Sequence, residues 1–135
     1  MAYKIDEIEG IGPAYAAKLN EAGIKTTDDF LKMCCDAKGR DAAAAKTGIS
    51  ESLILSWANM ADLMRVNGVG RQYAEILHAA GVDTIKELRT RNAENLAAKM
   101  KEVNDAKKLA KACPSEKVVQ GWVDKAKTME PLITH

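Results

Sequence analysis

The sequence is poor in the features that mark several large classes of protein. Only 4% of its 135 residues are aromatic, and it has three prolines and three cysteines. No apolar run approaches the ~20 residues that a membrane-spanning helix needs, and the N-terminal residues lack the basic-then-apolar order of a signal peptide. We therefore expect no membrane segment, a cytoplasmic location, and reduced thiols at Cys34, Cys35 and Cys113.

Catalytic and metal-binding patterns are also missing. His78 has no cysteine or aspartate at ligand spacing, and His135 is the last residue. The sequence has no phosphate-binding loop, no nucleophile elbow and no paired-carboxylate site. It therefore predicts a protein that is not an enzyme, with no catalytic residues, no metal site and no cofactor.

What the sequence does contain is alanine and aliphatic side chains. Hydrophobic residues make up 47% of the chain, enough to bury one core. Ala, Leu and Met favour helices, whereas strands favour β-branched and aromatic residues. These proportions predict an all-α protein with a single domain over residues 1–135. We expect Trp57 and Trp122 to anchor its core, and Tyr15 and Tyr73 to pack against nearby turns.

The chain contains an internal repeat. Shifting it by 58 residues aligns 5–12 with 63–70, and the match continues for another eighteen residues. Near the end of each copy a second match aligns Trp57 with Trp122 at an offset of 65, so the second copy has about seven extra residues. Duplication predicts that both copies fold alike and form one compact domain with pseudo-two-fold symmetry. The predicted parts are repeat 1 at about 3–62, repeat 2 at about 63–127 and a C-terminal tail at 128–135.

Sequence signals for helix ends occur in the same order in both copies. Proline or arginine after a glycine turn, a threonine capping box and a serine cap each predict where a helix begins. Because Glu87 is a better third-position partner than Asp29, the second capping box is predicted to be the stronger one. Gly23 and Gly81 are expected to end the first helix of each copy in the left-handed conformation. The predicted starts are at Pro13 and Arg71, at Thr26 and Thr84, and at Ser50 and Ser115.

The extra residues of the second copy fall near 92–111. At this place copy one predicts a short helix within 41–47 that ends at Gly48. Copy two predicts a longer helix over 93–112 that stops before Pro114. We expect about ten helices in total, with both glycine turns on one side of the domain.

The two glycine turns, Gly10-Ile11-Gly12 and Gly68-Val69-Gly70, carry a resemblance. Their pattern of apolar residues and glycines, with an alanine four residues later, resembles the helix-hairpin-helix proteins. These include modules of DNA polymerase beta, the NAD-dependent DNA ligase and the Holliday-junction protein of bacterial branch migration. The resemblance implies a SAM-like, five-helix type of fold in which paired units bind the DNA backbone, and turn carbonyls that can hold K⁺ or Na⁺ beside a phosphate. Physically, glycine leaves N–H groups uncovered at a helix N-terminus, where the dipole favours an anion.

The two turns are not equally equipped for phosphate. Arg71 and Gln72 stand beside the free N–H groups of the second turn. The first turn has carboxylates at Glu7 and Glu9, and its nearest cation is Lys18, one helical turn further on. Like charges repel, so the first turn is expected to bind DNA less well. The candidate DNA-binding residues are Gly68, Val69, Gly70, Arg71, Gln72, Gly10, Ile11, Gly12 and Lys18.

Across nearly all of its length the chain is also similar to one uncharacterised bacterial family of small proteins. Members have two such turns and share a tryptophan helix that joins the units. The matching segment runs through Gly48-Ile49-Ser50, Trp57-Ala58-Asn59 and Ala61-Asp62-Leu63-Met64-Arg65. This similarity supports the fold and implies little about function.

Charge is unevenly distributed, although the net charge is only +1. Residues 1–85 carry nine basic and twelve acidic side chains, whereas residues 86–127 carry eleven and six. An electrostatic binding face is therefore expected in the C-terminal half. Its lysines form either a rail for phosphates or an ordinary solvated helix face. These lysines are Lys99, Lys101, Lys107, Lys108 and Lys111.

Two functions are open at this point. The leading one is weak, sequence-independent binding of double-stranded or branched DNA through the N–H groups of 68–72, aided by Arg71, Lys18 and the C-terminal lysines. The alternative is a cytosolic adaptor that uses the same fold to hold a protein partner. In that case Ile11 and Val69 plug the core and no nucleic acid is bound. The sequence leaves the oligomeric state open.

Overall fold

The protein is all-helical, as its composition predicts. A computed structural model describes residues 3–134, and in this part the only β contact is an isolated bridge between Lys4 and Thr26. Eight α-helices and one 3-10 turn cover these residues, one element fewer than expected. None of the helices is long and apolar enough to cross a membrane. The elements are η1 (Ile5–Glu7), α1 (Pro13–Glu21), α2 (Thr27–Cys34), α3 (Ala37–Thr47), α4 (Glu51–Leu63), α5 (Arg71–Ala79), α6 (Ile85–Leu88), α7 (Ala93–Lys107) and α8 (Glu116–Lys127).

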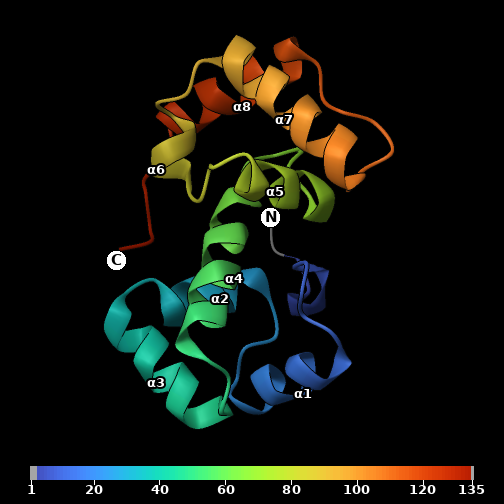
Figure 1. The fold of residues 1–135 in the computed structure, drawn as a ribbon. Coiled ribbons are helices and arrows are strands. Elements are labelled where there is room, and N and C mark those ends of the chain that lie inside the picture. The colour runs from blue at the N-terminus through green and yellow to red at the C-terminus, as the bar shows by residue number, and fades with distance from the viewer. Residues whose placement is uncertain (1–2, 135) are drawn as a thin grey trace.

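The helices form two groups joined by α4 (Figure 1). Helices α1, α2 and α3 lie at one end of the molecule, and α5 to α8 lie at the other. Helix α4 runs between the groups and contacts α2, α3 and α5. It closes the first repeat, and α8 has the same place at the end of the second. Each repeat therefore ends in a long tryptophan helix.

The helix caps agree with the sequence prediction except at Thr84. Ser50 and Ser115 accept hydrogen bonds from the backbone at the start of α4 and α8. The capping box of Thr26 is complete, with Asp29 returning a bond to the Thr26 N–H. The expected stronger box at Thr84 was wrong, because no cap bond from this side chain is present. The positive φ of Gly23 and Gly81 confirms the left-handed helix ends.

The third helix of each repeat differs in length from its prediction. Helix α3 begins at Ala37 rather than near residue 41, because the Asp36 carboxylate caps the N–H of Gly39 at 2.7 Å. It ends at Gly48 with a φ of +74°, as predicted. Helix α7 ends at Lys107 rather than continuing to residue 112. The residues after it form an irregular loop.

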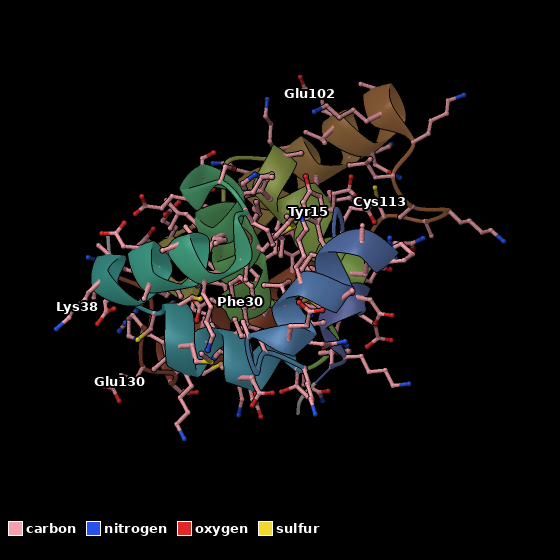
Figure 2. All side chains as sticks on the ribbon, turned by 90° about the horizontal axis from the view of Figure 1, so that it is seen from below. Tyr15, Phe30, Lys38, Glu102, Cys113 and Glu130 are labelled. Carbon is pink, nitrogen blue, oxygen red and sulfur yellow. The ribbon has the colours of Figure 1, made fainter. Side chains whose placement is uncertain are left out.

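A single hydrophobic core extends through both repeats. Trp57 and Trp122 are 2% and 5% exposed, which confirms that they anchor the core. Phe30 lies among the helices, whereas the labelled Lys38 points outward (Figure 2). Cys34 carries a free thiol in this core, where burial raises its pKa to about 11.

The C-terminal tail returns to the first repeat. The Arg65 guanidinium donates to the carbonyl of Glu130 at 3.0 Å. Arg40, which is 3% exposed, donates to the carbonyl of Thr134 at 2.6 Å. Ile133 is buried between these two contacts. The Arg40 contact therefore connects the tail to α3 of repeat 1, whereas Arg65 lies just after α4, where repeat 2 begins.

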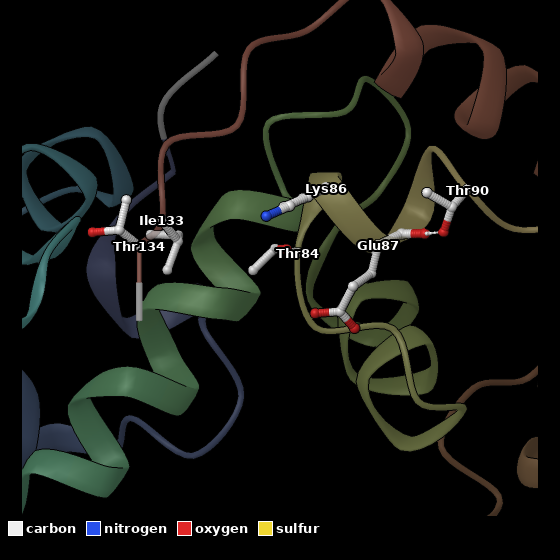
Figure 3. Close-up of a pocket in the computed structure, with 6 residues that line it drawn as sticks. All are labelled: Thr84, Lys86, Glu87, Thr90, Ile133 and Thr134. Carbon is white, nitrogen blue, oxygen red and sulfur yellow. Dashed lines mark hydrogen bonds between the residues drawn. The ribbon is translucent and has the colours of Figure 1, made fainter.

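A hollow of about 540 Å³ separates the tail from α6 (Figure 3). Ile133 and Thr134 line one side of it, and Thr84, Lys86 and Glu87 line the other. Figure 3 marks no hydrogen bond across the hollow between these two sets of side chains. The hollow is therefore a gap beside the docked tail, with one apolar wall.

Candidate functional site

The two glycine turns have matching backbones. The φ of Gly10 is +96° and that of Gly68 is +94°, a region that L side chains rarely adopt. In each turn the residue after this glycine donates its N–H to the carbonyl oxygen three residues before it. The N···O distance is 3.1 Å for Ile11 and 3.0 Å for Val69. Ile11 and Val69 are buried in the core. The turns therefore bring backbone rather than these two side chains to the surface.

A tryptophan covers each turn. A Cβ atom at Gly10 would lie 3.1 Å from Nε1 of Trp57, and one at Gly68 would lie 3.3 Å from Nε1 of Trp122. Glycine is needed at these positions both for its φ and for the close approach of the indole. A tyrosine packs on each tryptophan in turn. The ring centroids are 5.1 Å apart for Tyr15 and Trp57 and 5.3 Å apart for Tyr73 and Trp122.

The last glycine of each turn begins the next helix. Gly12 is the N-cap of α1 and Gly70 is the N-cap of α5, and among residues 3–134 no side chain caps either helix. The first N–H groups of a helix have no acceptor within it. Pro13 removes one of these donors from α1, whereas α5 keeps all three over residues 71–73. The second turn therefore presents more unpaired backbone donors than the first.

A shallow hollow of about 480 Å³ opens at the start of α5. The hollow lies at the free N–H groups of α5, and the side chains of Arg71 and Gln72 are exposed there. The partial positive charge of the helix N-terminus also points to this place. The hollow combines backbone donors, a cation and an amide. Its lining residues are Gly68, Gly70, Arg71, Gln72 and Tyr73.

An ion pair joins the two turns. Nε of Arg71, in the second turn, donates a hydrogen bond to Oε2 of Glu9 in the first. The Arg71 side chain is 50% exposed and the Glu9 side chain is 40% exposed. The two turns therefore lie next to each other. The cation that the sequence assigns to phosphate binding already has a carboxylate partner within the protein.

A second carboxyl group lies close to this pair. Partial burial raises the pKa of Glu75, and the neighbouring charge of Glu9 raises it further. Arg71 and Lys107 act in the opposite direction, because their positive charges favour the ionised form. Acidic and basic side chains therefore lie close together at the start of α5, and Arg71 is not an isolated charge.

Lys18 is the candidate cation of the first turn. It is exposed, and it lies in the last turn of α1. It lies six positions after Gly12, which places it about 9 Å along the helix axis. The nine candidate residues thus divide into backbone at both turns, two exposed side chains at the second turn, and one lysine at the far end of α1.

Sequence reasoning treated Glu9 only as a repulsive charge and missed its partner. A signal for the pair was present in the repeat alignment. Glu9 corresponds to Asn67 of the second copy, and Arg71 corresponds to Pro13 of the first. Two departures from the repeat therefore carry opposite charges. Complementary departures of this kind indicate a contact between the copies.

The fold and the turns define an all-helical protein of two matching halves, each with a tryptophan packed over a glycine turn. The chain belongs to the family described as a domain of unknown function, DUF4332, whose family model matches residues 9–129. No curated protein and no solved structure matches the chain. The matched range includes both glycine turns and both tryptophan helices, and it ends before the docked part of the tail.

Proposed function

We propose that this protein is a non-enzymatic, cytoplasmic module of the helix-hairpin-helix type that binds the phosphate backbone of DNA. The observation that carries the proposal is the uncapped N-terminus of α5, which opens onto the hollow at the second turn. Free N–H groups and the helix dipole favour an anion there, and Arg71 and Gln72 add two donors. Backbone N–H groups at a helix N-terminus hold phosphate oxygens without reading base edges, so we expect binding to be independent of sequence.

The ion pair with Glu9 makes this binding weak. A phosphate that contacts Arg71 has to displace the Glu9 carboxylate or share the guanidinium with it. Because both side chains are about half exposed, water screens their attraction and exchange is feasible. We expect Glu9→Gln to strengthen DNA binding, since it removes both a competitor for Arg71 and a charge that repels phosphate.

Binding of a labelled duplex and a labelled four-way junction tests the proposal by fluorescence anisotropy. Measurements at ~50 mM and ~200 mM salt are compared, because phosphate binding releases counterions and weakens steeply with salt. The expected result is detectable binding at the lower salt and a clear loss at the higher. Absence of binding at the lower salt rejects the function.

Variants at the second turn locate the contact. Arg71→Glu together with Gly70→Ala should reduce affinity at least about tenfold, which corresponds to ~1.4 kcal/mol. A Cβ at Gly70 meets no atom within 4 Å, so this variant should keep its helicity. Lys117→Glu on α8 is the matched charge control, since it is exposed and outside the hollow. Equal affinity of the double variant and the control would place the contact elsewhere.

A protein partner is the second candidate. It is favoured by the acidic character of the first turn, where Asp6 and Glu7 are exposed and Glu9 neutralises Arg71. In this case the same surface would bind a basic or mixed-charge protein segment. The salt titration separates the two functions, because a protein adaptor shows no duplex binding at low salt.

The proposal includes a K⁺ or Na⁺ ion that the turn carbonyls would bind. A cation held there would bridge to a phosphate oxygen and offset the charge of Glu9. Replacing K⁺ by a large organic cation at constant ionic strength should then weaken DNA binding. Unchanged affinity would remove the ion from the proposal while leaving the backbone contact in place.

A further inference from the structure

The second repeat has a basic loop that the first repeat lacks. The extra residues of the second copy extend α7 and form the loop 108–115 before α8. This loop starts at Lys108, whose φ of +53° makes it the only non-glycine residue between 3 and 134 with a positive φ. Helices usually end this way at Gly or Asn, because a side chain in the left-handed region costs about 1–2 kcal/mol.

The loop is held in place by a buried side chain. Asn104, which is 8% exposed, donates from Nδ2 to the carbonyl of Ala110 at 3.1 Å. Its Oδ1 accepts from the Ala110 N–H at 2.8 Å. The Cys113 thiol also lies 3.9 Å from the carbonyl of Met100. Residues 108–113 are therefore an ordered part of the domain, and the charges that they carry have fixed places.

Three lysines of this region are exposed, namely Lys107, Lys108 and Lys111. Lys99, further back on α7, lies 3.8 Å from Glu102. Lys99 and Lys101 lie further back along α7, whereas the other three lysines lie at its end and in the ordered loop. We call Lys107, Lys108 and Lys111 the lysine loop.

The lysine loop lies beside the second glycine turn. Helices α5 and α7 contact each other, and the end of α7 reaches the side of the molecule where α5 begins (Figure 1). Lys107 and Arg71 act on the same carboxyl group, Glu75. Lys107 therefore adds positive charge near the ion pair in which Glu9 offsets the charge of Arg71.

We propose that the lysine loop is a second contact with the DNA backbone, adjacent to the hollow at α5. This inference rests on the proposed function and adds to it which further residues hold the duplex and on which repeat. The backbone at position 108 is in the left-handed region, which is strained for any residue except glycine. The lysine found there supplies a positive charge that glycine would lack. The hollow and the lysine loop would thus give repeat 2 phosphate contacts of two kinds, backbone donors at the turn and lysines in the loop.

Lys108→Gly separates the functional role from a structural one. Glycine removes the left-handed strain, so the urea midpoint of unfolding should rise. Affinity for a labelled duplex at ~50 mM salt should fall about five- to tenfold, and the slope of log K against log salt should decrease in magnitude by about 0.9. Lys117→Gln, which removes an exposed lysine from α8, should leave both affinity and slope unchanged.

A second variant, Lys107→Gln with Lys111→Gln, keeps the backbone of Lys108. The magnitude of its slope should decrease by about 0.9 for each of the two lost phosphate contacts. If the wild-type protein binds the duplex and neither variant changes the slope, the lysine loop is not a contact, and the proposed function stands. If the wild-type protein does not bind at low salt, both proposals fail. If the variants lose affinity for polyglutamate but not for the duplex, the loop serves an acidic protein and the assignment to DNA is overturned.

Discussion

Asp62, near the end of α4, accepts a hydrogen bond from the backbone N–H of Ile85, the first residue of α6, at 2.9 Å. Its other carboxylate oxygen lies 2.7 Å from the Arg65 guanidinium, and the Asp62 side chain is fully buried. One side chain from the helix that joins the repeats thus caps a helix of the second repeat. The Thr84 side chain makes no cap bond, and the N–H of Glu87, which such a cap would need, donates instead to the backbone carbonyl of Thr84 at 3.1 Å.

Asp62→Ala should destabilise the protein by about 3 kcal/mol, because it leaves a partly buried arginine and a backbone N–H without their acceptor. Urea unfolding followed by circular dichroism measures this loss. Asp105→Ala on the exposed side of α7 is the control and should change stability by less than about 0.5 kcal/mol. Hydrogen exchange at α6 that is no faster in Asp62→Ala than in the wild type would contradict the capping role.

The two glycines of one turn should respond differently to substitution. Gly10→Ala places a Cβ at a φ of +96° and 3.1 Å from the Trp57 ring, so we expect a loss of about 1–2 kcal/mol. Gly12 has a φ of −83° and open space around its Cβ position. Gly12→Ala should therefore be tolerated, within about 1 kcal/mol of the wild type. Equal losses for the two variants in thermal unfolding would contradict the described turn.

Docking of the tail should contribute measurably to stability. Ile133→Ala removes a buried side chain and should cost about 2 kcal/mol. Leu132, its neighbour, is 39% exposed and provides a matched control in Leu132→Ala. The difference between the two unfolding midpoints measures the docking. If both variants unfold like the wild type, the tail does not add to the stability of the folded protein.

The pH dependence of stability should carry the sign of the Glu75 shift. Its raised pKa means that the folded state disfavours the ionised form. The contribution of Glu75 is therefore fully present below its ordinary value of 4.5 and is lost as the pH rises through the raised pKa. Glu75→Gln should match the wild type near pH 4 and become the more stable protein towards pH 7, as measured by urea unfolding across this range.

Asp29→Asn is the control with the opposite sign. Hydrogen bonds from the backbone N–H groups of Lys25 and Thr26 lower the pKa of Asp29. Its contribution is present above its ordinary value of 3.8 and is lost as the pH falls through the lowered pKa. Asp29→Asn should thus be less stable than the wild type at pH 7, and the difference should shrink in acid. A parallel response of Asp29→Asn and Glu75→Gln would contradict both assignments.

Features that depend on a few neighbouring residues followed from the sequence. The serine caps at Ser50 and Ser115 and the glycine stop at Gly48 each involve atoms within four residues of one another. The buried places of Trp57 and Trp122 followed from their matching positions in the repeat. Local rules describe such features because the chain itself brings the interacting atoms together.

Contacts between distant residues did not follow from local rules. Arg71 and Glu9 are 62 residues apart, and Ile85 and Asp62 are 23 apart. The capping box at Thr84 has the right residue types, yet its side chain makes no cap bond, and a buried carboxylate from another helix accepts from the N–H of Ile85. The electrostatic character of the candidate site therefore depends on how the repeats pack together, which the sequence of either repeat does not specify.

The contact between Arg40 and Thr134 also sets an order of events during protein synthesis. The two residues are 94 positions apart, and a ribosome adds about 5–20 residues per second. Arg40 is therefore made roughly 5–20 seconds before its acceptor. During this interval the first repeat has a guanidinium for which the final acceptor has not yet been made, so its last interactions form after both repeats have been translated. A chain released early, at residue 129, would contain both glycine turns and still lack this contact.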